Sequence, residues 1–126
     1  MTTLRTDFGG EVHPFRLTPP MIVELERLTG AGIGSLFDRV VNRRFGFADV
    51  RETIRLGLIG ADMTPREASA LVEAYVDKRP IAESYVLAVA VLDALFTGSG
   101  TDAAPGAPAP GDEAPEALAG IAGASS

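Results

Sequence analysis

The sequence predicts a mainly α-helical domain of the α+β class, a compact five-helix bundle with a small N-terminal β-hairpin and a disordered C-terminal tail. Apolar residues recur at helical spacing in five segments, and an alternating pattern around a Gly-Gly pair precedes them. The composition then changes sharply at Gly98. Because the chain of 126 residues has six Phe, two Tyr and no Trp, its core is expected to consist mostly of Leu, Val, Ile and Ala.

The composition divides the chain into two parts. Residues 1–97 are expected to form one domain of hairpin and helical bundle, since this length has room for one core. Residues 98–126 are mainly Ala, Gly, Pro and Ser, which bury too little surface to offset the entropy of ordering, so a flexible tail is expected. One transient helical turn at residues 115–123 is the alternative. The tail has four acidic residues and no Lys or Arg, and it therefore carries most of the formal net charge of −6.

The first predicted element is the hairpin. Apolar and polar residues alternate over residues 4–8, Gly9 and Gly10 supply a turn that needs positive φ, and apolar residues return over 12–17. Pro14 lacks an N–H and belongs on an edge or at a bulge. A lone hairpin is marginally stable in water, so this one is expected to pack against the helices.

Two helices are expected next. Thr18 followed by Pro19 begins the first helix, and Gly30 ends it. Ser35 with Asp38 three residues later resembles a capping box and is expected to begin the second. Their apolar positions are Met21, Leu25 and Leu28 in the first helix and Leu36, Phe37, Val40 and Val41 in the second.

Three further helices complete the predicted bundle. Asp49 is expected to cap the third helix, which closes at Gly60. Thr64, followed by Pro at the first helical position and Glu three residues after the cap, begins the fourth, which Pro80 breaks. The fifth, residues 80–96, is apolar nearly all round and is expected to lie centrally, with the other helices packed about it.

The residue inventory argues against an enzyme and against a metal or cofactor site. With one histidine, His13, and no Cys, the chain cannot assemble a two-His zinc site, a Ser-His-Asp triad or a thiolate site. The acidic pI of about 4.7 disfavours nucleic acid and anionic membranes as partners. The longest apolar run, residues 84–96, is too short to span a bilayer. Without an apolar signal segment, a cytoplasmic location is expected.

Two features suggest anion or nucleic-acid binding but have simpler interpretations. The glycines of residues 30–34 follow a predicted helix and lack a Walker lysine, so they are expected to end one helix and begin the next. Arginines 43, 44, 51 and 55 form either a patch that docks a phosphate or carboxylate, or ordinary surface ion pairs, which we favour. The helix pair within residues 49–77 has too few basic residues for a DNA-reading helix.

Apolar surface remains as the functional candidate. A domain of fewer than 100 residues cannot hide all of its apolar side chains, and exposed apolar patches usually mark partners. The fifth helix and the hairpin are the expected sources of such a patch, with plain core residues as the alternative. The candidate protein-interaction residues are Leu4, Phe8, Phe15, Phe37, Tyr85, Val89 and Phe96.

The sequence also resembles a known family. The run DVRE at residues 49–52 followed by LGLIG at residues 56–60 is the most specific part. GE at 10–11, FRLT at 15–18 and the pairs EA at 67–68 and LV at 71–72 extend it. With these motifs, residues 7–97 resemble the small gene-transfer-agent tail proteins that are grouped with phage tail assembly chaperones.

The resemblance implies a non-enzymatic role in building a long, non-contractile phage-like tail. Proteins of this kind are thought to coat the helical tape-measure protein and to recruit tail tube subunits, so both are implied partners. The location is then the cytoplasm or a phage-like particle. Two other functions stay open: a minor structural component retained in the mature tail, and a small adaptor or regulator that forms a homodimer.

Overall fold

The computed structural model describes residues 2–98 and contains the predicted fold class within that range. The tail expected at residues 98–126 lies outside the described residues, apart from Gly98. The hairpin comprises β1 (Leu4–Phe8) and β2 (Glu11–Phe15). Five α-helices follow in the described part: α1 (Pro19–Thr29), α2 (Ile33–Val41), α3 (Phe47–Gly60), α4 (Pro65–Val72), which continues as the π-helical turn η1 (Glu73–Asp77), and α5 (Ile81–Thr97).

The hairpin has the predicted turn and pairing. Gly9 and Gly10 both have positive φ, 67° and 90°, which is the backbone that a two-residue turn of the favoured hand requires. The antiparallel register places Phe8 opposite Glu11 and Pro14 opposite Arg5. The hairpin does not stand alone, because β2 packs against α3 and β1 contacts α5.

The helix ends confirm two of the predicted signals. Gly30 follows α1 in the left-handed conformation (φ 72°), and its N–H donates to the carbonyl oxygen of Glu26. At the start of α4, the Thr64 hydroxyl accepts from the backbone N–H of Glu67, 3.2 Å away, with Pro65 at the first helical position. Both ends therefore follow from local sequence alone.

Two predicted caps are wrong in position, because the acceptor comes from another helix at α2 and from the third helical residue at α3. The second helix begins at Ile33, two residues before Ser35, and the Glu26 carboxylate of α1 accepts from the Ile33 N–H at 2.8 Å. In α3, Asp49 is the third helical residue instead of the cap, and its carboxylate accepts from the Gly46 N–H at 2.7 Å. Asp49 thus still satisfies an N-terminal donor of α3.

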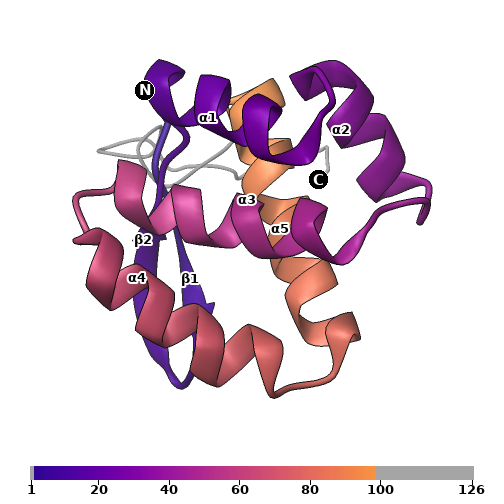
Figure 1. Ribbon diagram of the computed structural model, residues 1–126. Coiled ribbons are helices and arrows are strands. Elements are labelled where there is room, and N and C mark those ends of the chain that lie inside the picture. The colour runs from indigo at the N-terminus through magenta and orange to yellow at the C-terminus, as the bar shows by residue number, and fades with distance from the viewer. Residues whose placement is uncertain (1, 99–126) are drawn as a thin grey trace, which may run out of the picture.

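The central helix is α3, which corrects the expectation that the fifth helix lies in the middle. Figure 1 shows α3 between α1 and α2 at one end of the molecule and α4 at the other. The buried residues Ile54 and Leu58 of α3 have no exposed surface. Two glycines bring the hairpin close to this helix: the Arg16 N–H donates to the Gly57 carbonyl oxygen at 2.8 Å, and Gly60 lies against the Arg16 backbone. The apolar helix α5 packs against α3 and also contacts α2, η1 and β1, while Val86 and Phe96 remain exposed.

Candidate protein-binding surfaces

Two pairs of stacked aromatic rings join α2 and its following loop to α5. Phe37 stacks on Phe96 with 4.5 Å between ring centroids and 15° between planes. Phe45 stacks on Tyr85 at 5.1 Å and 19°, and the Tyr85 hydroxyl donates to the Val41 carbonyl oxygen at 3.3 Å. We call Phe37, Phe45, Tyr85 and Phe96 the aromatic cluster. Stacked pairs of this kind stabilise the α2–α5 contact by about 0.5–1.5 kcal/mol each beyond their buried area.

The outer face of α5 is an apolar strip with a distinctive spacing. Ala82, Val86, Val89, Asp93 and Phe96 are separated by four, three, four and three residues, so their side chains follow one line along the helix. We call these five residues the α5 seam. Val86 is 66% exposed and Phe96 is 48% exposed, while Val89 is partly buried. Such spacing is typical of a helix face that packs against another helix. Within residues 2–98, Phe37 of α2 stacks on Phe96 at one end of the seam, while Val86 stays exposed.

Charged groups of both signs flank this region. The Arg43 guanidinium lies 5.9 Å from the centre of the Tyr85 ring, within the range of a cation–π contact. Arg44 forms an exposed ion pair with Asp38 at 3.2 Å. Asp93 is exposed within the seam itself, and no ion pair involves its carboxylate among residues 2–98. The seam is thus apolar with one negative charge near its centre.

The arginines on α3 are engaged in ion pairs. Arg51 donates to both carboxylate oxygens of Asp77, at 2.9 and 3.1 Å, and this hydrogen bonding raises the pKa of Arg51. Arg55 donates to Glu52 at 2.7 Å. The ion-pair interpretation of these residues is confirmed, and they are not available as an anion-binding patch.

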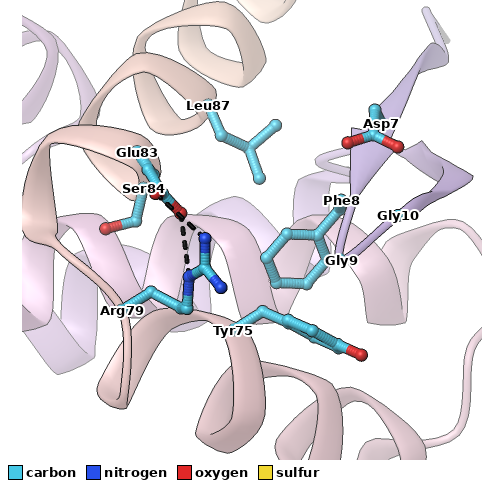
Figure 2. A pocket seen from close by; sticks show the side chains of 9 residues that line it. All are labelled: Asp7, Phe8, Gly9, Gly10, Tyr75, Arg79, Glu83, Ser84 and Leu87. Atoms are coloured by element: carbon cyan, nitrogen blue, oxygen red, sulfur yellow. Dashed lines mark hydrogen bonds and ion pairs between the residues drawn. The ribbon is translucent and has the colours of Figure 1, made fainter.

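A second surface feature is a cleft beside the hairpin turn. It has a volume of about 470 Å³ and lies between the end of β1, η1 and the first half of α5. Figure 2 shows Phe8 and Leu87 extending toward each other from opposite walls, with the Tyr75 ring below Phe8 in this view. The Tyr75 ring packs on Gly9, where an added Cβ would lie only 2.6 Å from ring carbons. This contact holds the hairpin turn against η1.

The rim of the cleft is polar. Arg79 donates to both carboxylate oxygens of Glu83 at 3.2 Å, and these hydrogen bonds raise the pKa of Arg79. Asp7 stands on the opposite, hairpin side. The Ser84 hydroxyl is satisfied by the Ile81 carbonyl oxygen at 3.1 Å. The cleft therefore has an apolar floor and a rim with two carboxylates and one guanidinium.

The comparisons with known proteins identify the family. A family model described as "Phage tail tube protein, GTA-gp10" matches residues 2–98. The chain belongs to this family. Comparison with curated proteins and with solved structures gave no match. Membership confirms the resemblance to gene-transfer-agent tail proteins, implies contacts with other phage tail proteins and fits a place in a phage-like particle.

The structure of this tail protein brings four of the seven predicted interaction residues together. Phe37, Tyr85 and Phe96 belong to the aromatic cluster, and Val89 and Phe96 to the α5 seam. Their role in binding a partner stays a prediction. Sequence reasoning missed Phe45 and Val86, although the four-three spacing of residues 82–96 was visible in the sequence. Val41 was expected on the inner face of the second helix, but it is 45% exposed.

The three hairpin candidates lie elsewhere. Phe8 is 6% exposed and Phe15 is 1% exposed, so the expectation that they form an exposed patch is wrong. Both rings point into the bundle and meet at 6.0 Å in an edge-to-face contact, because the hairpin lies on α3 and α5. Leu4 is partly buried opposite Phe15 and lies outside the two stacked pairs.

Residues 2–98 contain no group of three or more His, Asp or Glu side chains placed to hold a metal ion. Over the same range, every helix is too short or too polar to cross a membrane.

Proposed function

We propose that this tail protein is a non-enzymatic assembly factor whose α5 seam binds an amphipathic helix of another tail protein. The observation that carries the proposal is the exposed four-three spacing of the seam, with Val86 and Phe96 open to solvent. The tape-measure protein is the client we expect, and the tail tube subunit is the second. Binding takes place in the cytoplasm, while the tail is being built.

The shape and chemistry of the seam favour a helix as the bound element. An amphipathic helix places apolar side chains at the same spacing, so its side chains can pack between Val86, Val89 and Phe96. The rigid aromatic cluster along one border supplies a preorganised wall. Arg43 on that border would attract an acidic residue on the flank of the client helix.

Asp93 favours a different protein over a second copy of this chain. In a parallel pair of α5 helices, Asp93 would face the same carboxylate of the other copy, and burying two like charges is costly. A client helix with Lys or Arg at the matching position would pair with Asp93 instead. The charge therefore selects both the partner and its register along the seam.

The test is copurification of the full chain with the tape-measure product and with the tail tube subunit. Val86→Asp and Phe96→Asp place a charge on the seam and are expected to abolish copurification. Val23→Asp is the matched control, because Val23 on α1 is 64% exposed and lies away from the seam. The assignment fails if both folded seam variants still copurify like the wild-type chain.

A second candidate function is a structural component retained in the finished tail. The family description as a tail tube protein favours it. A retained subunit needs a large permanent interface, typically above about 1,200 Å² of buried surface. Quantification of the chain in purified particles separates the two: an assembly factor is depleted from finished particles, and a tube component is present in many copies. A stable homodimer without any tail partner would instead support the adaptor role.

A further inference from the structure

The hairpin leaves one strand edge open beside the cleft. In a hairpin closed by a two-residue turn, the residues flanking the turn, here Phe8 and Glu11, form a hydrogen-bonded pair. The pairs then alternate, so Asp7 and Arg5 belong to non-hydrogen-bonded pairs. Their backbone N–H and C=O groups point away from β2, and among residues 2–98 no other strand lies there to receive them.

The outer edges of β1 and β2 differ in the backbone groups that they present to a further strand. On β2, the outward-pointing residues include Pro14, which has no N–H to donate, and the chain just after β2 is tied to α3 by the Arg16–Gly57 hydrogen bond. On β1, Asp7 and Phe8 instead line the cleft between the turn end of the strand and the first half of α5 (Figure 2). The open edge and the cleft therefore coincide.

The walls of the cleft define what fits there. Phe8 and Leu87 provide an apolar floor, and the Tyr75 ring closes the end near the turn. Among residues 2–98, the Asp7 carboxylate forms no ion pair, whereas the Glu83 carboxylate is paired with Arg79. The volume of about 470 Å³ is that of a small-ligand pocket, which suits a few extended residues and not a helix.

We propose that an extended segment of a partner protein adds to the free edge of β1 and fills this cleft. Its backbone pairs with the N–H and C=O groups of Asp7, an apolar side chain lies over Phe8 and Leu87, and a Lys or Arg lies beside Asp7. The C-terminal residues 99–126 of this chain do not fit the charge requirement, because they contain four acidic residues and no Lys or Arg. The site is independent of the α5 seam.

A short blocked peptide of alternating valine and lysine is the probe. Added to the full chain, it is expected to protect the Asp7 amide from hydrogen exchange and to shift the NMR signals of Phe8, Tyr75 and Leu87. The same peptide with its edge-facing amides N-methylated keeps every side chain but loses the backbone donors. It is expected to lose both binding and protection.

A charge reversal tests the side-chain part of the proposal. Asp7→Lys is expected to weaken binding of the peptide by about fivefold, since it replaces an attraction with a repulsion. Lys is common on edge strands, so the hairpin is expected to stay folded. Glu73→Lys is the control, because Glu73 is an exposed acid that lines neither the cleft nor the seam and forms no ion pair among residues 2–98.

Three results overturn the proposal. The first is a peptide that does not bind the wild-type chain. The second is binding that leaves the exchange of the Asp7 amide unchanged or that persists with the N-methylated peptide. The third is an equal loss of binding for Asp7→Lys and Glu73→Lys in chains that melt like the wild type, which indicates general charge attraction instead of a strand site.

Discussion

Helix α3 has more charged residues than α5, yet α3 is the helix that lies in the centre. Four charged residues lie on α3, yet it is the central helix, and α1, α2, α4, α5 and β2 all pack against it. Two charged residues in 17 make α5 far more apolar, yet it leaves Val86 and Phe96 open to solvent. Apolar content alone therefore does not decide which helix lies in the middle.

Close approach and satisfied polar groups explain the difference. Gly57 and Gly60 let the chain after β2 reach the α3 backbone, and Asp49 is buried with a hydrogen bond at each oxygen. On α5, apolar side chains instead continue past the buried side into the seam. Apolar surface beyond what the core requires is typical of a binding face.

The largest effect is expected from Gly60→Ala. The added Cβ would overlap the carbonyl oxygen of Arg16, a backbone atom that cannot turn away. The chain must shift as a whole, and we expect a loss of about 3 kcal/mol in the free energy of unfolding. Urea unfolding of the two proteins measures it.

Gly34→Ala is the matched control for this change. Gly34 lies in α2, and an added Cβ meets no atom within 4 Å. Alanine is a better helix former than glycine, so we expect a gain of about 0.5–1 kcal/mol. An equal loss for both substitutions would contradict the view that close approach at Gly60 places α3 in the centre.

Asp49→Ala is expected to cost about 2 kcal/mol in unfolding free energy. Asp49 is 4% exposed and accepts from Arg39 at 2.6 Å and from the Gly46 N–H at 2.7 Å. Its removal leaves a partly buried guanidinium and a helix N-terminal donor without this acceptor. Asp93→Ala on α5 is the control, and thermal melts should show a change within about 0.5 kcal/mol.

The third effect concerns the aromatic cluster. Phe96→Ala removes the ring stacked on Phe37, and we expect a cost of about 1 kcal/mol. Phe47 is equally exposed, at 48%, but no ring stacks on it within the described residues. Phe47→Ala should therefore cost less in the same unfolding experiment. Equal costs would show that the stack adds nothing beyond burial.

Local signals in the sequence predicted most of the fold. The Gly9 and Gly10 turn, the Gly30 stop and the Thr64 cap each depend on residues adjacent in the chain, and each is confirmed. The starts of α2 and α3 were misplaced, because Glu26 reaches across from another helix and Asp49 reaches back to Gly46. Composition favoured α5 as the centre, since the spacing of apolar residues carries no information about the carbonyl that approaches Gly60.

Part of the candidate surface could be predicted from the sequence, and part could not. Phe37, Tyr85, Val89 and Phe96 were identified because an apolar helix in a small domain cannot be wholly covered. Phe8 and Phe15 were misjudged, because alternation in a strand indicates which side chains share a face but not whether helices cover that face. Phe45 lies in a loop, where periodicity gives no signal.

The smallest expected change in stability belongs to Val86→Asp, and it tests the comparison between α3 and α5 most directly. Val86 is 66% exposed, and Val and Asp have similar helix propensities, so the free energy of unfolding should change by no more than about 0.5 kcal/mol. The same change places a charge in the seam and should abolish capture of a client helix. A loss above about 1 kcal/mol would mean that Val86 contributes to the core. In that case α5 would be a structural helix like α3, and its apolar residues would not indicate a binding partner.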